Sequence, residues 1–381
     1  MLVDCNVIPE EPVYLDRFNP DDGTDLADVY TTLDYLNYGS DPAPLAAALR
    51  QISPEKYDVL SAIGLRNDLI FANTLLERGR ALRDAPDHAG RHPWLEGVGE
   101  IGRQTQTADR VGVNYHSAGF AAGFDGRPEP GLLLGLAGAG LRSNLRWTGD
   151  GGSAEIDTVK LGLYAGCFTP DVFINAALVG GHNETAARRN LNFAGHGYDA
   201  TAGLDTVDLG LNRAAASVQD GESLAAHLAG EARWRPGGWE MSPLARLSYF
   251  NLRQNAFDEG GAGDLDLHVN GFRAQLLRTE LRLLAGRNFS ARTGLQLKPE
   301  LTLGWAHGVA LDDRTLSARF VNPGGEAVEI DGYGDQTDSF LAGAGLSVAL
   351  AGHLALYGRY DGELGCGFSS QAIKLGLRYG F

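Results

Sequence analysis

Apolar residues recur at every second position over most of the chain after residue 94. The pattern is clearest in residues 373–381, where Ile, Leu, Leu, Tyr and Phe alternate with Lys, Gly, Arg and Gly. Because neighbouring residues of a β-strand point to opposite faces, this period predicts strands with one apolar and one polar face. The same alternation recurs in residues 159–165, 224–234, 277–283, 295–306 and 340–350.

Short clusters of Asp, Pro and Gly separate these runs and are typical of turns between strands. The clearest turn signals are residues 125–126, 150–152, 220–221, 236–238 and 323–325. The runs between the turns predict twelve strands, and an even number is what a bacterial barrel requires. The predicted strands are residues 93–105, 111–125, 131–146, 154–168, 171–188, 213–234, 239–254, 268–287, 291–310, 338–350, 353–362 and 371–381.

Residues 41–85 follow a helical spacing instead, with apolar residues at intervals of three and four. Ser53, Pro54 and Glu55 form a strong helix start, because Ser caps the backbone, Pro fits the first turn and Glu favours the positive end. Pro86 ends the helix, since the residue before proline avoids helical geometry. The predicted helix 54–83 is about 45 Å long at ~1.5 Å per residue, close to the thickness of a bilayer with its headgroups.

Three features favour a transmembrane barrel over a soluble sheet. The apolar face continues through nearly every predicted strand while the other face carries Arg and Glu, as lipid outside and water inside require. Many predicted strands exceed the ~9–11 residues of a tilted membrane span. Aromatic rings near strand ends suit the headgroup level. These aromatic residues are Trp94, Trp147, Trp234, Trp239, Tyr249, Tyr360 and Tyr379. The predicted fold class is all-β, a twelve-stranded antiparallel transmembrane β-barrel with an N-terminal α-helix threading the pore.

Charged residues on the polar face of the predicted strands are candidates for the pore lining. They are Glu231, Arg233, Arg278, Glu280, Arg282, Lys298 and Glu300. A solvated sheet face is the simpler interpretation, whereas a closed barrel turns the same residues into a charged pore wall. The candidates on the predicted helix are Arg66, Arg78, Arg80 and Arg83, which are available to pair with acidic wall residues. We therefore hypothesise that the helix threads the pore.

Composition and motifs exclude several classes of function. The net charge of −16 and the pI of about 4.9 argue against nucleic acid as a partner, because phosphate binding requires a basic surface. No run of 18 apolar residues occurs, so no transmembrane helix is predicted. HExxH, P-loop and GxSxG motifs are absent, and the histidines are scattered. The sequence therefore predicts no enzyme activity, no cofactor and no bound metal.

Cysteine usage adds one open alternative. Cys5, Cys167 and Cys366 are far apart and form no CxxC pair, which disfavours a zinc ribbon or a redox site. Cys167 lies in an apolar strand, where we expect a small packed residue rather than a reactive thiol. A disulfide between Cys167 and Cys366 is an alternative, because outer-membrane proteins fold from an oxidising periplasm.

Several short motifs follow one another in a fixed order along the chain. They are residues 49–57 (LRQISPEKY), 92–99 (HPWLEGVG), 117–125 (SAGFAAGFD), 242–249 (SPLARLSY), 257–262 (FDEGGA) and 356–362 (LYGRYDG). In order and spacing they resemble the linker helix, the strands and, at residues 257–262, a loop after a middle strand of the autotransporter C-terminal β-barrel, the translocator domain of type V secretion. The terminal Tyr379 and Phe381 resemble the aromatic signal that the barrel assembly machinery reads.

This resemblance spans residues 40–381 and implies a translocator that anchors an N-terminal passenger in the outer membrane of a Gram-negative-type bacterium and helps export it. It divides the chain into a passenger remnant or linker (1–40), an α-helical linker inside the pore (41–90) and the barrel (91–381). The implied partners are outer-membrane lipid and lipopolysaccharide, the barrel assembly machinery and a covalently linked passenger.

The chain departs from the family pattern in two respects. Residues 1–40 are too short for a β-helical passenger and contain no signal peptide, so we expect the chain to be the tail of a longer product or to start further upstream. No Asn-Asn pair occurs, so we predict that a passenger stays attached or is cut by another protease. The alternative function is a stand-alone outer-membrane channel for small solutes, but such a channel does not need the predicted helix.

Overall fold

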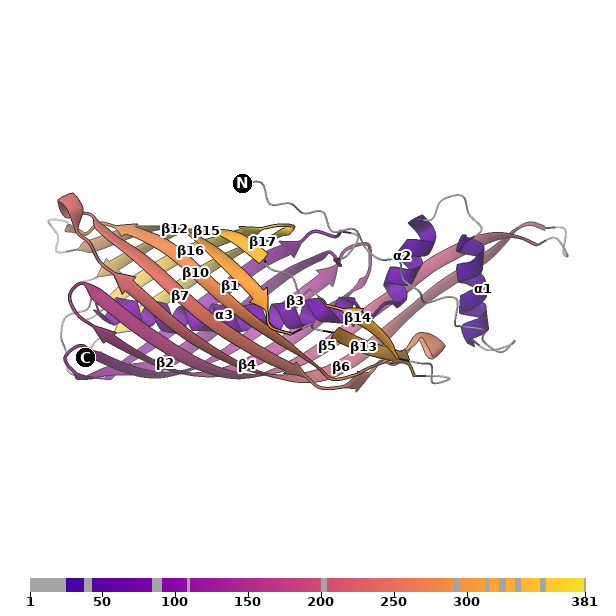
Figure 1. Cartoon of the computed structure of the whole chain (residues 1–381), viewed down its shortest axis with the longest axis horizontal. Coiled ribbons are helices and arrows are strands. Elements are labelled where there is room, and N and C mark those ends of the chain that lie inside the picture. Colours follow the sequence, from indigo (N-terminus) through magenta and orange to yellow (C-terminus); the bar gives the residue numbers. More distant parts are fainter. Residues whose placement is uncertain are drawn as a thin grey trace.

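Twelve long strands form one antiparallel wall that closes on itself (Figure 1). The computed structural model describes residues 25–37, 43–83, 91–107, 110–199, 204–290, 295–312, 315–321, 327–332, 337–349 and 354–379. The wall strands are β1 (Arg91–Gln104), β2 (Val113–Glu129), β3 (Leu132–Trp147), β4 (Gly152–Phe168), β5 (Val172–Asp199), β6 (Leu204–Ala232), β7 (Glu240–Gln254), β10 (Phe272–Gly286), β12 (Gln296–Ala310), β15 (Thr337–Ala349), β16 (Leu354–Gly365) and β17 (Phe368–Tyr379). The first and last wall strands, β1 and β17, pair with each other and close the barrel. The predicted twelve-stranded antiparallel barrel is thus confirmed.

Side chains along each wall strand point alternately outward and inward, as the period of two predicts. On β4, Leu161 is 66% exposed on the outer surface, whereas the next-door Lys160 is fully buried inside. On β17, Leu375 is 64% exposed and Lys374 only 2%. A continuous belt of exposed aliphatic side chains is stable against lipid and would be an aggregation site in water.

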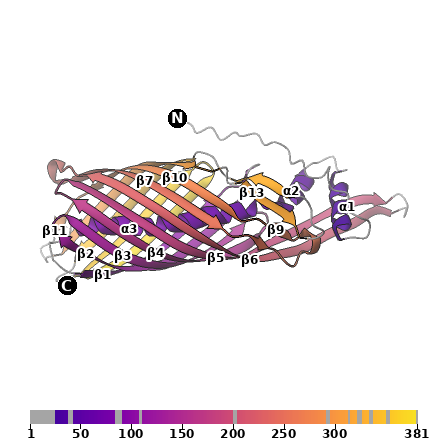
Figure 2. The same ribbon diagram turned by 60° about the horizontal axis from the view of Figure 1, so that its bottom comes forward.

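Among the described residues, three helices precede the wall: α1 (Asp25–Asn37), α2 (Ala43–Ile52) and α3 (Lys56–Arg83). The helical segment breaks at Ser53, whose hydroxyl accepts a hydrogen bond from the Glu55 N–H at 3.3 Å, and α3 begins at Lys56 rather than at Pro54. The helix α3 runs lengthwise inside the barrel in both ribbon views, so the predicted internal helix is confirmed (Figures 1 and 2).

The helix α3 also qualifies, by length and composition, as a membrane span. Among the described residues it is the one such helix, over Lys56–Leu82, and 83% of its most apolar window is buried within the protein. Run length alone missed it because polar residues such as Asn67 and Asp68 interrupt the apolar stretch. The barrel wall rather than lipid therefore surrounds this helix.

The β5–β6 hairpin projects far beyond the wall, which the sequence did not predict (Figure 1). Beyond Arg189, β5 pairs only with β6, and β6 pairs with β7 only from Gly221 onward. The predicted turn at Asp220-Gly221 is wrong, because both residues lie within β6 and pair with β5. Asp and Gly suit a turn locally, but here the neighbouring strand satisfies their backbone groups.

A second, smaller sheet lies at the base of this hairpin (Figure 2). Its strands are β8 (Phe257–Asp258), β9 (Leu267–Val269), β13 (Thr315–Phe320) and β14 (Val328–Asp331), while the two-residue β11 (Phe289–Ser290) only extends the main sheet at β12. The predicted loop 257–262 thus contains a strand, and the predicted strand 268–287 is divided between β9 and β10. The predicted turn at 323–325 lies outside the described residues.

Two of the aromatic residues expected at the headgroup level point inward instead. Trp94 and Trp147 are 5% and 3% exposed, whereas Trp234 and Trp239 are 66% and 47% exposed. The Trp94 Nε1 donates a hydrogen bond to the Tyr164 hydroxyl at 3.0 Å, which satisfies the indole N–H inside the barrel. Whether each Trp points inward or outward follows from its odd or even position in the alternation along the strand, not from its nearness to a strand end.

The structure also settles the cysteine alternatives. Cys167 is a free thiol and Cys366 is disulfide-bonded, so the two do not pair with each other. The expectation of a packed Cys167 is wrong as well, because its side chain is exposed in phase with the outward Leu161 and Leu163 of β4.

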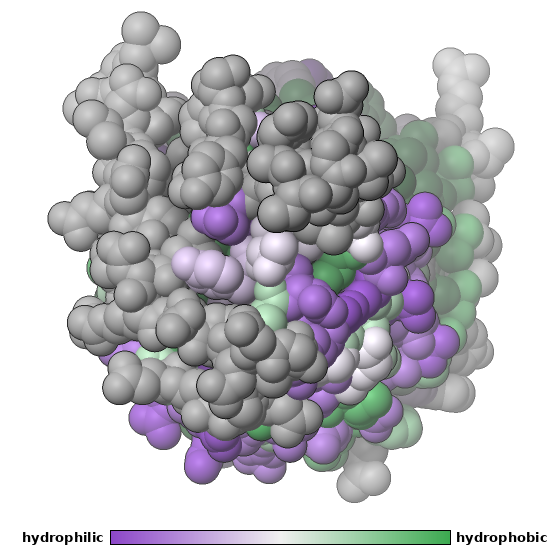
Figure 3. Space-filling model, turned by 90° about the vertical axis from the view of Figure 1, so that its right-hand side faces the viewer, coloured by the Kyte–Doolittle hydropathy of each residue, from purple (hydrophilic) through white to green (hydrophobic). Residues whose placement is uncertain are grey.

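The two ends of the barrel differ in the length of their connections. Short turns such as residues 130–131 and 169–171 join the strands at one end, whereas the β5–β6 hairpin and residues 255–271 extend the other. Outer-membrane barrels have short turns on the periplasmic side and long loops outside. By that rule the hairpin end corresponds to the extracellular side, and hydrophilic residues gather over the described part of its rim (Figure 3).

Candidate functional site: the helix-filled pore

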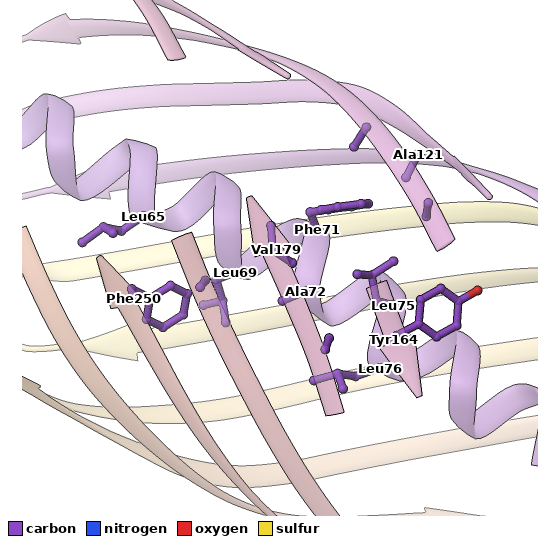
Figure 4. Close-up of a cluster of buried hydrophobic side chains, with 14 of the residues drawn as sticks. Leu65, Leu69, Phe71, Ala72, Leu75, Leu76, Ala121, Tyr164, Val179 and Phe250 are labelled. Carbon is purple, nitrogen blue, oxygen red and sulfur yellow. The ribbon is translucent and has the colours of Figure 1, made fainter. Parts of the chain in front are cut away.

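One side of α3 is apolar and packs against the wall from β2 to β7 (Figure 4). Phe71 and Leu75 of α3 are 1% and 0% exposed, and their side chains approach β4. The same cluster includes Leu65, Leu69, Ala72 and Leu76 of the helix and Ala121, Leu133, Tyr164, Val179, Phe250 and Leu252 of the wall. Full burial of such side chains stabilises by about 1.5–3 kcal/mol each, so this cluster holds the helix against one half of the wall.

Glycines make this apolar contact close. A Cβ added at Gly162 of β4 would lie 2.6 Å from Leu75 Cδ1 and 3.0 Å from Phe71 Cε1. Conversely, a Cβ added at Gly64 of α3 would lie 2.7 Å from Leu252 Cδ1 of β7. Each surface therefore lacks a side chain where the other projects one, as close packing requires.

Near the extracellular end, Arg66 of α3 reaches the seam where the barrel closes. Its guanidinium nitrogens lie 3.0 Å from a Glu100 oxygen on β1 and 2.6 Å from a Glu363 oxygen on β16. It also donates a hydrogen bond to Ser370 of β17 at 2.5 Å. Charge-assisted hydrogen bonds of this kind are stronger than neutral ones, so one side chain ties the helix to three strands of the seam.

Two further arginines bind the wall towards the periplasmic end. Arg80 donates to both carboxylate oxygens of Glu300 at 2.7 Å and lies 3.6 Å from Glu231. Arg78 forms a two-point pair with Asp125, with contacts of 2.5 Å and 2.9 Å. Arg83 is the last residue of α3, and its side chain lies outside the described part of the structure.

The helix also carries carboxylates that bind wall lysines, which the sequence analysis did not foresee. Glu77 lies 2.9 Å from Lys374 and 3.3 Å from Arg359. Asp68 lies 2.6 Å from Lys160, in a pair whose side chains are 1% and 0% exposed. The sequence does contain a signal for these pairs. Lys160 and Lys374 lie on the polar face of strongly alternating strands, so they point into the barrel and need an acidic partner there.

All pore-lining candidates lie on the inner side of the wall. Glu280 lies 2.9 Å from Arg278 and 2.8 Å from Arg282. Lys298 and Arg233 share the carboxylate of Glu240, at 2.9 Å and 3.5 Å. The other two candidates, Glu231 and Glu300, face Arg80 as described above. Some of these wall residues thus form ion pairs with α3, and the others form ion pairs with neighbouring residues of the wall.

A small cavity lies beside the helix. A cavity of about 40 Å³ lies between α3 and the charged wall, lined by residues that include Arg66, Asn73, Arg278, Thr302 and Glu363. A buried water needs roughly 10–15 Å³ by this measure, so the cavity holds a few waters and not a solute. This cavity therefore leaves no room for a solute between the helix and the charged side of the wall.

At the extracellular end, α1 and α2 pack on the β5–β6 hairpin. Val29 and Leu33 of α1 are buried in one cluster with Leu191 of β5. Arg213 of β6 donates hydrogen bonds to the Asp25 carboxylate of α1. These hydrogen bonds lower the pKa of Asp25 below its usual range, against a smaller opposing effect of partial burial.

Only part of the C-terminal aromatic signal lies within the described residues. Tyr379 is the last residue of β17, with its side chain not described, and Phe381 lies outside the described range. Among the described residues, no group of three or more His, Cys, Asp or Glu side chains could hold a metal ion.

Known proteins share this helix-filled barrel. The fold is similar to the translocator domain of the autotransporter NalP from Neisseria meningitidis, with a TM-score of 0.61 and 16% identity over 83% of this chain and 98% of that chain. It is also similar to the β-domain of the Bordetella autotransporter BrkA, with a TM-score of 0.52 and 18% identity over 76% of this chain and 99% of that chain. A search of curated protein sequences finds no match. The sequence model of the autotransporter β-domain matches residues 93–361, and the chain therefore belongs to the autotransporter β-domain family.

Proposed function

We propose that this chain is an outer-membrane translocator that anchors an N-terminal passenger and helps to export it to the cell surface. The family places the barrel in the outer membrane of a Gram-negative bacterium and makes it a secretion module. The single observation that carries the proposal is the direction of α3: its N-terminal end lies at the extracellular mouth and its C-terminal end at the short-turn end. Any polypeptide that precedes α3 therefore continues outside the cell.

The described residues also support a division of labour along the chain. On this proposal residues 41–90 are the linker inside the pore and residues 91–381 form the membrane anchor. Residues 1–40 are the end of a passenger or its linker, and α1 rests on the hairpin outside the wall. We propose no enzymatic activity for the barrel, since every charged group described in the pore serves to bind α3 or a neighbouring wall residue.

A stand-alone channel for small solutes is not favoured. The cavity beside α3 is about 40 Å³, whereas small-molecule sites occupy roughly 300–1,000 Å³. Ion pairs on several strands hold the helix in place, among them Arg66–Glu363, Arg78–Asp125 and Arg80–Glu300. A porin would gain nothing from a helix that fills its lumen.

The proposal includes partners beyond the passenger. The barrel assembly machinery would read Tyr379 and Phe381 at the C-terminus, as the family resemblance implies. Outer-membrane lipid would contact the exposed aliphatic belt, which includes Leu161 and Leu375. Lipopolysaccharide would contact the outward residues above this belt.

A surface-display experiment tests the function. A signal peptide and an epitope-tagged reporter are fused before residue 25, and protease is added to intact Gram-negative cells that express the fusion. We expect the tag to be digested from outside, while the heat-modifiable barrel stays in the membrane fraction. A matched fusion to residues 91–381, which lacks the helices, should leave the tag inside. A reporter that stays periplasmic on a correctly folded full-length barrel would contradict the proposal.

The same preparation tests the fate of the passenger. Because the chain contains no Asn-Asn pair, we expect the purified fusion to keep reporter and barrel on one polypeptide. Mass spectrometry that finds a cut within residues 41–92 of the barrel purified alone would contradict this expectation.

A further inference from the structure

A row of unpaired arginines crosses the outer face of the barrel near its extracellular end. Arg103 of β1, Arg146 of β3 and Arg188 of β5 belong to one row of directly paired positions, with Asn114 of β2 and Ser153 of β4 between them. The three arginines are exposed. Within the described part of the chain, none of the three guanidinium groups forms a hydrogen bond or a salt bridge.

The row lies above the lipid-facing belt. The outward residues of β3 are, in order, Leu132, Leu134, Leu136, Gly138, Gly140, Arg142, Asn144 and Arg146. At ~3.3 Å per residue and a strand tilt of ~40°, Arg146 lies about 15 Å above Gly140 along the membrane normal. That depth is beyond the acyl chains, among the sugars and phosphates of the outer leaflet.

The nearest acidic residues are already engaged below this row. Arg142 lies 2.6 Å from Asp157 and 3.5 Å from Glu155, so it compensates both carboxylates. Glu184 and Asp220 continue the row of Asp157 and do not enter the arginine row. The three upper arginines therefore form a local positive surface on a chain whose net charge is −16.

The surface beside Arg146 and Arg188 is hollowed. A groove of about 980 Å³ is lined by His116, Arg146 and Arg188 and by the apolar Ile101 and Val218. Its lining also includes the carboxylates of Glu155 and Asp258, which are engaged by Arg142 and His268. Arginines on alternate strands are about 9.6 Å apart at ~4.8 Å per strand, so two long guanidinium side chains can reach one phosphorylated molecule. Two free guanidinium groups beside apolar side chains suit an anionic amphiphile rather than a soluble protein.

We propose that Arg103, Arg146 and Arg188 bind the phosphate groups of lipopolysaccharide in the outer leaflet. The inference rests on the outer-membrane location in the proposed function and adds to it a defined partner site. Guanidinium groups bind phosphate through two parallel charge-assisted hydrogen bonds, and each of these arginines has its donors free for this purpose. Bound in this way, lipopolysaccharide sets the position of the barrel along the membrane normal. The site also makes lipopolysaccharide the preferred lipid beside strands β1 to β5.

Lipid binding to the purified, folded full chain tests the proposal. Its affinity is measured for rough lipopolysaccharide, for the same lipopolysaccharide after removal of its phosphates, and for inorganic phosphate. We expect the phosphorylated form to bind at least tenfold more tightly than the dephosphorylated form, and free phosphate to bind weakly. The variant R103Q/R146Q/R188Q should lose this preference while keeping its heat-modifiable mobility, since its altered side chains are exposed.

A charge-matched control separates the site from net charge. The variant R127Q/R235Q/R287Q removes three arginines from the periplasmic end, where Arg127 and Arg287 lie over aromatic rings and Arg235 lies near Asp171. This control should keep the full preference for phosphorylated lipopolysaccharide. Equal loss in both variants, or no loss in the first, would overturn the proposed site. Surface display of the reporter is scored separately, so a failed lipid site and a failed translocator are distinguishable.

Discussion

The two halves of the wall hold α3 by different means. From β2 to β7 the contact is close-packed and largely apolar, and ion pairs within it are dry. The Asp68 and Lys160 side chains are 1% and 0% exposed, and those of Arg78 and Asp125 are 4% and 0% exposed. From β12 through β17 to β1 the contact is ionic and less enclosed, and Glu77 keeps 19% of its side chain exposed beside Lys374.

This difference determines how much stability is lost when a charged residue on either side loses its partner. A buried charge that loses its partner cannot be solvated, and the loss costs about 3–5 kcal/mol. A partly exposed charge recovers much of its lost interaction from water, so the same loss costs less. The dry half therefore fixes the position of α3, and the ionic half tolerates change.

Removal of the helix breaks both kinds of contact and has the largest expected effect. Deletion of residues 41–85 leaves a wall with charged inner residues and a water-filled path, so single-channel conductance should rise from a closed to a steady open level. Planar-bilayer recordings of the refolded barrel measure this change. Deletion of residues 25–37, which removes only α1, is the control and should leave the pore closed. Unchanged conductance after the larger deletion would show that α3 is not the plug.

A matched pair of carboxylate substitutions compares the two halves directly. Asp68→Asn leaves Lys160 buried without a charged partner and should lower the free energy of unfolding by about 3–5 kcal/mol. Glu77→Gln makes the same chemical change on the ionic side and should cost less, about 1.5 kcal/mol, because Lys374, although only 3% exposed, lines the water-sized cavity beside α3. Urea titrations in detergent, read by heat-modifiable mobility, measure both values. Equal costs would remove the distinction between the halves.

Loss of an apolar side chain tests the packing of the dry half. Leu75→Ala leaves a cavity against β4 and should cost about 3 kcal/mol. The control Leu163→Ala removes the same atoms from the outer face, where detergent or lipid fills the space, and should cost less. Gly162→Ala alone should destabilise, because its Cβ would lie 2.6 Å from Leu75 Cδ1. Combined with Leu75→Ala it should be tolerated, and additive costs would argue against direct contact.

The smallest expected effect concerns α1. The folded pKa of Asp25 is lowered, so its pair with Arg213 contributes stability above the unfolded pKa and loses it as pH falls through the folded value. Docking of α1 should thus be constant from pH 7 to about pH 4 and weaken below. Hydrogen exchange of α1 amides, corrected for intrinsic rates, measures this. Asp25→Asn should exchange faster at neutral pH and lose the acid step; a step that persists in the variant belongs to another group.

The amino-acid sequence by itself determined the local geometry of this protein. The period of two set which side chains of β4 and β17 meet lipid, since successive residues of any strand point to opposite faces. The cap at Ser53 set a helix boundary close to the predicted one, because capping depends on neighbouring backbone groups. Neither feature needs knowledge of distant parts of the chain.

Only the tertiary structure decided the partners inside the barrel. Arg66 and Glu363 are 297 residues apart, and they meet because the wall closes and α3 turns one side towards the seam. The hairpin of β5 and β6 extends beyond the wall and buries its apolar side against α1 and α2. Such contacts depend on barrel closure and helix rotation, which no local spacing in the sequence encodes.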